Sequence, residues 1–503
     1  MAKALSLAKS TAFSFISLLS SAILGIGLTA LVARVLAPEA MGHYSLVVWF
    51  TSLAGLIANL GYVTTATRFM AERLGRDRPD EAAGVLAHAV RNVFWTGLAV
   101  TAGVLALAPF APRLYPDLPI TLYLAIGALG ILPTAMTALF AGACQGLQRY
   151  DWMAAVTGLG TVLTLGGAIA VLLSGGGIPG LLAVTAGVAA VSSLAYALLL
   201  ARWNPGFWQG RLDASEARQL KRFQWAVFAM LGLDAIVWQR SELFFLGAWA
   251  PAQQVAFYSL AFGLSTMAMK LLPGTLVGLL IPMMARSEGA GDREATAQVF
   301  TRSCRAMAML AVPVAVGGSL LSLPLVHVLY GAEYLPVAGL LSALLIAGAL
   351  VMIYGYPASS VLYSTGGERY LVKVGISVAV VNLVLDVALI PFWGAWGAVA
   401  ANALAQITSL GPGLWGAYKY AGVRPPVKVL VPVGLATALM ALPVWLIVSH
   451  TPAWMAMLIA PVAGGLFYAV ALWLTGALDA TERKLVIGLF RKLAQRKVIP
   501  QAD

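Results

Sequence analysis

Apolar stretches of about 20 residues, the length that a helix needs to cross the hydrocarbon core of a membrane, recur along almost the whole chain. Of the 503 residues, 60% are hydrophobic and 10% are charged. A soluble domain has roughly 25% charged residues. No stretch alternates polar and apolar residues as a barrel strand does, so helices must satisfy the backbone hydrogen bonds inside the bilayer. The sequence therefore predicts an all-α, polytopic integral membrane protein.

Fourteen segments are predicted to span the membrane, and the even number puts both termini on one side. The first seven are Thr11–Arg34, Tyr44–Thr64, Arg91–Ala111, Ile120–Ala143, Met153–Leu173, Leu181–Ala201 and Gln224–Ala248. The other seven are Ala256–Ala285, Ala306–Leu329, Val337–Leu362, Leu371–Ile390, Gly397–Ala417, Val429–Val448 and Trp454–Leu474.

The basic residues of the connecting segments, which give the chain a net charge of +12, alternate between two faces. One face has nearly all of these basic residues, including Lys3, Lys9 and those of the tail. The connecting segments of the other face contain Arg113, and Arg34 lies at a helix end on that side. Short loops rich in lysine and arginine stay in the cytoplasm. We therefore expect a multi-pass protein of a bacterial inner membrane with both termini in the cytoplasm, and no nucleic-acid partner.

Two segments on the basic face are predicted to be helical. Asp213 and Glu216 have the spacing of a capping box, so a short helix should lead into the seventh span. In the tail, an apolar stripe from Leu485 to Leu493 lies beside several lysines and arginines. Such a helix can lie on anionic membrane lipids, or its charges can serve only as a topology signal.

The chain also repeats itself. The repeated features include Ala-Pro followed by Tyr-Ser-Leu, and Arg-Tyr after Gly, in the same order twice. We expect parallel repeats with an N-terminal six-helix lobe (residues 1–208), a C-terminal six-helix lobe (209–420), and an extra helix pair with a basic tail (421–503). The matching segments are 37–46 with 250–260, 70–91 with 284–305, 146–150 with 366–370, and 177–180 with 394–397.

Ionisable residues inside predicted spans are the candidate site, because each costs about 2.5–3.5 kcal/mol to insert. Helix rise places Arg240, Lys270 and Asp386 at one depth. In one interpretation the cations bind an anionic cargo and an acid couples transport to a cation or proton. In the other they form structural ion pairs, such as Lys270 with Glu242 or Asp386. The candidates are Arg240, Lys270 and Arg34 for the cargo, and Asp234, Glu242 and Asp386 for a coupling ion.

Four segments of the chain resemble the signature of the oligosaccharide flippases, which export O-antigen and other polysaccharides. They belong to the multidrug/oligosaccharidyl-lipid/polysaccharide (MOP) exporter superfamily. The segments are Arg240–Gly247, Tyr258–Ala261, Pro282–Arg286 and, in the first half, Arg68–Gly75. The resemblance implies two lobes around a central cavity that opens alternately to each side, and an undecaprenyl-pyrophosphate-linked oligosaccharide as cargo. It also implies an acidic residue near Arg240; here Glu242 stands two positions away.

Other functions remain open at this point. A multidrug/cation antiporter and a lipid II flippase belong to the same superfamily, although Arg240 and Lys270 favour an anionic cargo. A membrane glycosyltransferase or polymerase is disfavoured because no Asp-x-Asp motif occurs and the four histidines are scattered. No phosphate-binding loop for ATP is present, and Cys144 and Cys304 have no metal-ligand spacing. We expect a transporter, not an enzyme, without cofactor or metal, with polysaccharide polymerase or chain-length proteins as possible partners.

Overall fold

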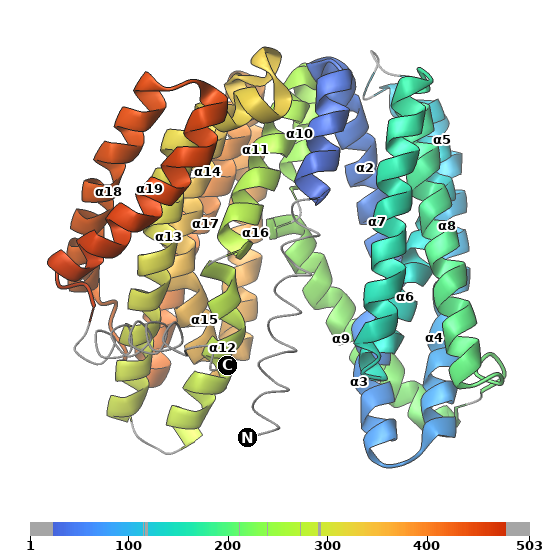
Figure 1. Cartoon of the computed structure of the whole chain (residues 1–503). Coiled ribbons are helices and arrows are strands. Elements are labelled where there is room, and N and C mark those ends of the chain that lie inside the picture. Colours follow the sequence, from blue (N-terminus) through green and yellow to red (C-terminus); the bar gives the residue numbers. More distant parts are fainter. Residues whose placement is uncertain are drawn as a thin grey trace, which may run out of the picture. The chain divides into compact units, whose positions relative to one another are not determined.

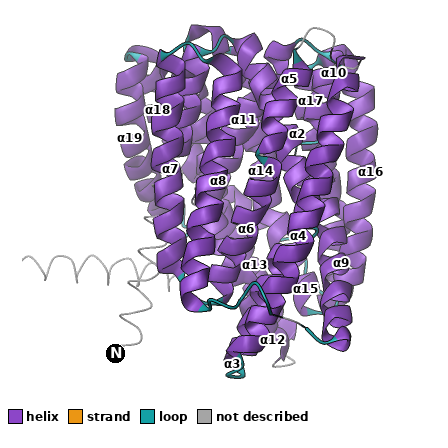
Figure 2. Ribbon diagram, turned by 90° about the vertical axis from the view of Figure 1, so that its right-hand side faces the viewer, coloured by secondary structure: helices purple, strands orange, loops and turns teal. Residues whose placement is uncertain are grey.

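The computed structural model describes residues 24–478, apart from residues 114, 116–118, 211, 239, 272 and 290–292. In these residues the regular structure is helical throughout, and no strand occurs (Figure 2). The chain divides into two compact units. Unit 1 is Met1–Ser259 with Ala379–Ala401, and unit 2 is Leu260–Val378 with Asn402–Asp503. The predicted all-α class is confirmed.

Figure 1 shows the helices of both units along the chain. Unit 1 holds α2 (Pro38–Asn59), α3 (Tyr62–Gly75), α4 (Pro79–Leu107), η1 (Ala108–Arg113), α5 (Ile120–Leu129), α6 (Ile131–Gly146), α7 (Tyr150–Leu173), α8 (Gly177–Trp203), α9 (Ala214–Trp238) and α10 (Glu242–Trp249). Three helices have residues in both units: α11 (Ala252–Leu271), α16 (Glu368–Trp393) and α17 (Ala395–Ala421). Unit 2 holds α12 (Pro273–Gly289), α13 (Arg293–Tyr330), η2 (Ala332–Tyr334), α14 (Pro336–Leu350), η3 (Val351–Gly355), α15 (Tyr356–Ser364), η4 (Val427–Val429), α18 (Leu430–His450) and α19 (Ala453–Leu474).

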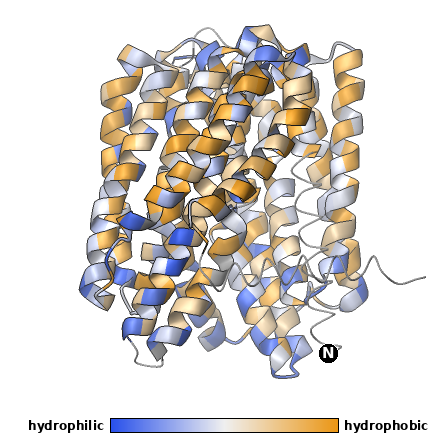
Figure 3. Cartoon of the chain, turned by 60° about the vertical axis from the view of Figure 1, so that its left-hand side comes forward, coloured by the Kyte–Doolittle hydropathy of each residue, from blue (hydrophilic) through white to orange (hydrophobic). Residues whose placement is uncertain are grey.

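Helices long and apolar enough to cross a membrane number ten in the described residues, or eleven with the bent pair α11–α12. Each predicted span coincides with one helix or with two or three consecutive helices. Of the first span, only the end, in a helix over Leu24–Val35, is described. Hydrophobic residues dominate the middle of the helices, and hydrophilic residues gather at their ends (Figure 3). Large apolar side chains such as Leu173 and Phe392 are more than 80% exposed, as expected for surfaces that face lipid. The chain is a multi-pass membrane protein.

The structure differs from the predicted spans in where helices break. The second span is two helices, α2 and α3, separated at Leu60 and Gly61, which both have positive φ. The seventh is also two, α9 and α10. Conversely, α13 begins at Arg293, well before the predicted start at Ala306, because a helix can continue beyond the apolar stretch by which a span is recognised.

The helix boundaries in the two halves of the chain match in the register of the sequence repeat. Residues 38 and 252 begin α2 and α11, residues 75 and 289 end α3 and α12, and residues 79 and 293 begin α4 and α13. Each pair is 214 positions apart. The two halves of the sequence therefore break their helices at equivalent places, which supports the repeat, while the domain boundaries at residues 208 and 420 stay a prediction.

Small residues allow close helix packing in unit 1. Gly142 and Gly146 of α6 face α3, where an added Cβ would come within 2.9 Å of Thr67. The Thr67 hydroxyl donates a hydrogen bond to the Gly142 carbonyl oxygen across this contact (2.8 Å). Tyr62, Phe69, Leu139 and Phe140 are among the buried side chains around it. Such contacts drive association where lipid removes the hydrophobic driving force.

In unit 2 the extra helix pair packs on the long helix α13. Met440, Val444 and Ala460 of α18 and α19 form a buried cluster with Leu320 of α13 against it. The Tyr468 hydroxyl donates a hydrogen bond to the Met309 carbonyl oxygen (2.8 Å). The pair predicted to be appended to the repeat is therefore held by specific contacts in this unit.

The predicted helix before the seventh span is confirmed, and α9 runs from Ala214 through Trp238 without interruption. The carboxylate of Glu216, which the sequence suggested for a capping box, binds Arg73 instead (2.8 Å). The tail stripe from Leu485 to Leu493 lies outside the described residues.

Candidate functional site

The first part of the candidate site is the break in the seventh span. Between α9 and α10, Arg240 has a φ of 60°, in the left-handed region that residues other than glycine rarely adopt. The amide nitrogens of Leu243 and Phe244 donate hydrogen bonds to the carbonyl oxygens of Arg240 and Ser241 (both 3.0 Å). A new helix therefore starts within the span, and the polar residues Arg240, Ser241 and Glu242 lie where it starts.

The second part comes from α16. Asn382 and Asp386 are four residues apart and share one face of the helix. Their side chains are 1% and 0% exposed, and Glu242 is 0% exposed. The Asn382 amide nitrogen lies 3.3 Å from Asp386 Oδ2, 3.5 Å from Glu242 Oε1 and 3.2 Å from Ser241 Oγ. One amide thus bridges two carboxyl groups; we call Ser241, Glu242, Asn382 and Asp386 the acid cluster.

The acid cluster contains two carboxyl groups and no basic residue of its own. Arg240 and the fully buried Tyr258 interact with the Glu242 carboxyl. Oδ1 of Asp386 is buried and accepts no hydrogen bond from any residue that the structure describes. Two buried carboxylates that share one amide repel each other when both are charged, and burial penalises each charge. Both effects disfavour the state in which the two carboxyl groups are ionised together.

Of the predicted site residues, the structure brings Arg240, Glu242 and Asp386 together. Arg34 is exposed at the end of the helix that includes Leu24, and Lys270 is exposed on the unit 2 part of α11. Asp234 lies in α9, and its side chain is outside the described part of the structure. The roles assigned to all six residues stay predictions.

The sequence did not identify two members of the acid cluster, Asn382 and Ser241, as site residues, and Tyr258 was considered only as part of the repeat and of the family signature. A signal for Asn382 existed, because a polar residue four positions before Asp386 in an apolar helix must share its face. The contact of α16 with Glu242, 140 residues earlier in the chain, left no such signal.

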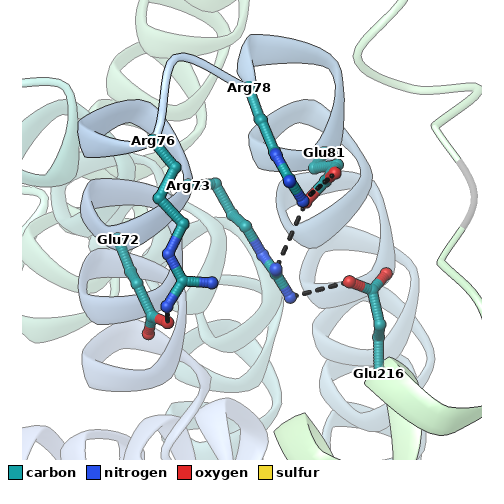
Figure 4. Close-up of polar contacts among 6 residues, drawn as sticks. All are labelled: Glu72, Arg73, Arg76, Arg78, Glu81 and Glu216. Carbon is teal, nitrogen blue, oxygen red and sulfur yellow. Dashed lines mark hydrogen bonds and ion pairs between the residues drawn. The ribbon is translucent and has the colours of Figure 1, made fainter.

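A second buried polar group in unit 1 lies where α3, α4 and α9 meet at their ends (Figure 4). Arg73 is 10% exposed, and its guanidinium lies 3.2 Å from Glu81 and 2.8 Å from Glu216. Arg78 also contacts Glu81 (3.1 Å). We call Arg73, Arg78, Glu81 and Glu216 the arginine network. It ties the start of α9 to the α3–α4 turn.

A metal centre made of amino-acid side chains is not apparent in the described part of the chain, where no three His, Cys, Asp or Glu residues come together suitably. Cys144 and Cys304 are both buried and not in a disulfide. The groups described at the candidate site are carboxyl, amide and guanidinium groups.

Comparison with known proteins gives a family and a fold. A family model described as "Polysaccharide biosynthesis protein" matches residues 31–339. No curated protein matches the chain. The lipid II flippase MurJ in an inward closed conformation is similar, with a TM-score of 0.74 and 14% identity, over 91% of this chain and 98% of that one. An inward-facing multidrug resistance MATE family transporter of the MOP superfamily has a TM-score of 0.66 and 17% identity, over 81% and 98%. A MOP superfamily transporter from Pyrococcus furiosus has a TM-score of 0.55 and 18% identity, over 81% and 93%.

Proposed function

Because the chain belongs to the polysaccharide biosynthesis protein family and has the fold of MOP superfamily transporters, we propose that it is a flippase for a lipid-linked oligosaccharide. The cargo is an oligosaccharide on undecaprenyl pyrophosphate. It moves from the cytoplasmic to the outer leaflet of a bacterial inner membrane, for surface polysaccharide biosynthesis. The family supports the glycan, and the fold supports movement across the bilayer.

The observation that carries a transport mechanism is the broken span with the acid cluster beside it. Discontinuous helices in secondary transporters bind substrates and coupling ions at their breaks, where backbone amide and carbonyl groups are no longer hydrogen-bonded within a helix. The left-handed Arg240 between α9 and α10 provides such a break. Alternating access follows if unit movement opens the cargo path first to one side and then to the other.

Coupling is assigned to Glu242 and Asp386. A proton or a monovalent cation between them removes the repulsion of two buried carboxylates, and release of that ion restores it. The energy of the acid cluster therefore differs between the loaded and empty states, as coupling requires. Asp234 is a further candidate on α9.

Cargo binding is assigned to Arg240, Lys270 and Arg34. A pyrophosphate needs compensating positive charge when it leaves water, and arginine and lysine provide it. Arg34 and Lys270 are both exposed, which supports this role. Arg240 would serve both the cargo and Glu242, and so link cargo binding to the coupling ion.

Complementation of a strain that lacks the gene tests this function. Arg240→Gln and Lys270→Gln should lower surface glycan and make the lipid-linked precursor accumulate, when both are measured per amount of protein in the membrane. Arg302→Gln, an exposed position on α13, is the matched control. Normal glycan with lost drug resistance would instead show an antiporter, accumulated lipid II would show a lipid II flippase, and sugar transfer by the purified protein would show an enzyme.

A further inference from the structure

A basic hollow lies in unit 2, where α13 begins and α17 ends. Its volume is about 590 Å³, within the range of small-molecule sites. It combines three cationic side chains with two tyrosines, and none of the described residues that line it is acidic. The lining residues are Arg293, Tyr418, Lys419, Tyr420, Gly422 and Arg424.

The cations are held in place by aromatic rings. Lys419 Nζ lies 5.1 Å from the ring centre of Trp415, and the Arg424 guanidinium lies 5.7 Å from that of Tyr418. Tyr370 of α16 supports these rings, with ring centres 5.8 Å from Trp415 and 6.1 Å from Tyr420. Cation–π contacts of this kind orient the charged groups without neutralising them.

The turn after α17 brings Arg424 back to the helix. Gly422 has a φ of 71°, which suits glycine, and its amide donates a hydrogen bond to the Tyr418 carbonyl oxygen (2.7 Å). Arg424, two residues later, therefore lies against Tyr418. The Tyr370 hydroxyl donates a hydrogen bond to the Pro412 carbonyl oxygen (2.8 Å), which fixes α16 to α17 beneath the hollow. The site is thus built from three segments of unit 2.

The ligand chemistry follows from charge and position. Guanidinium groups pair with phosphate oxygens in a two-point geometry. Trp415 and Tyr418 are 54% and 48% exposed at the end of a span, where aromatic residues mark the depth of lipid headgroups. The phosphate groups abundant at that depth are those of lipid headgroups.

We propose that this hollow binds the phosphate of an anionic phospholipid headgroup. The site does not depend on the flippase function proposed above, because it would anchor unit 2 in an anionic leaflet whatever the cargo. Phosphatidylglycerol offers the required chemistry, since its single phosphate gives the headgroup a net negative charge. In phosphatidylcholine an ammonium group offsets the charge of the phosphate.

Native mass spectrometry of the purified full chain in detergent tests the proposal. Wild type should retain phosphatidylglycerol in preference to phosphatidylcholine. Lys419→Gln and Arg424→Gln should each lower phosphatidylglycerol retention about fivefold, as expected for one basic residue near an anionic surface. The exposed Arg302→Gln serves as the control, and phosphatidylcholine retention should not change. Because both substituted residues are exposed, the two single variants should fold, and each gives a result by itself.

Two outcomes would overturn the proposal. Equal phosphatidylglycerol retention by wild type and both variants would show that the hollow binds no lipid phosphate. Binding of inorganic phosphate by wild type without preferential retention of phosphatidylglycerol would show a site for a soluble anion and not for a lipid. Glycan export is a separate measurement. Loss of glycan export by a variant that retains phosphatidylglycerol normally would concern the flippase function and would not contradict the lipid site.

Discussion

Unit 1 contains the arginine network and the acid cluster, which arrange their charges differently. In the arginine network, Arg73 and Arg78 face Glu81 and Glu216, whose side chains are 34% and 27% exposed. In the acid cluster, two carboxyl groups with 0% exposure share one amide and the neighbouring Arg240. The first arrangement pairs its cations with partly exposed carboxylates, whereas the second brings two fully buried carboxyl groups together.

This difference indicates which of the two, the arginine network or the acid cluster, can respond to an ion. A paired network is most stable as it stands, so a change of charge only weakens it. An unbalanced acid pair is most stable with a proton or cation bound, so its energy depends on occupancy. Helix α9 begins at the network, with Glu216, and ends next to Arg240 beside the acid cluster.

The largest effect is expected from neutralising the acid cluster. Asp386→Asn and Glu242→Gln should each lower glycan transport about 10- to 100-fold, the effect of losing a charged hydrogen-bonding group. The melting temperature should stay unchanged or rise, because one of two repelling buried charges is gone. The measurements are surface glycan in the complemented strain and thermal unfolding of the purified protein.

Glu333→Gln in η2, an exposed carboxylate outside unit 1, is the control for those variants. Full transport by either acid-cluster variant at normal protein abundance would remove the acid cluster from the mechanism.

Removing the central cation of the network should affect stability instead. Arg73→Gln leaves Glu81 and Glu216 without their shared partner and should lower the free energy of unfolding by about 2–3 kcal/mol, less than for a fully buried pair because both glutamates are partly exposed. Transport per folded molecule should remain normal. Adding Glu216→Gln should cost less than the sum of the two single changes, since the residues are in contact.

A stable Arg73→Gln protein with impaired transport would show that the network has a functional role and would weaken the contrast between the two groups.

The middle of α9 should be sensitive to a smaller change. Gly61 has a φ of 80°, and an added Cβ would lie 2.9 Å from the Gln224 carbonyl oxygen and 3.0 Å from the Phe228 amide nitrogen of α9. Gln224 in turn donates a hydrogen bond to the Leu60 carbonyl oxygen. Gly61→Ala should therefore destabilise the protein by about 1–2 kcal/mol through strain and displacement of α9.

Gly75→Ala provides the comparison for Gly61→Ala, because no atom lies within 4 Å of its added Cβ. Equal melting temperatures for the two variants would show that α9 does not depend on this close approach.

The smallest effect is expected at the edge of the network. Arg76 lies 2.8 Å from Glu72, one helical turn away, with the two side chains 57% and 36% exposed (Figure 4). Exposed pairs of this spacing contribute about 0.3–0.5 kcal/mol. Arg76→Gln should leave both abundance and transport nearly unchanged. A loss of stability as large as that expected for Arg73→Gln would mean that burial does not distinguish the two ion pairs.

Much of the fold could be predicted because it depends on local composition. Apolar length alone located the spans, and the repeat indicated that the two halves of the chain are equivalent. The breaks themselves were not predicted, because an apolar window gives no information on φ at Leu60 or Arg240. A span that looks continuous in sequence can therefore be two helices.

The sequence by itself determined the class of the protein, its membrane segments and the identity of the costly charges Arg240, Glu242 and Asp386. Each follows from the free energy of moving a residue into lipid, which depends on that residue and its near neighbours. The contact of Asn382 with Glu242 and that of Glu216 with Arg73 became apparent only in the tertiary structure. Each joins residues about 140 positions apart, and its energy depends on distance in space, which no local pattern records.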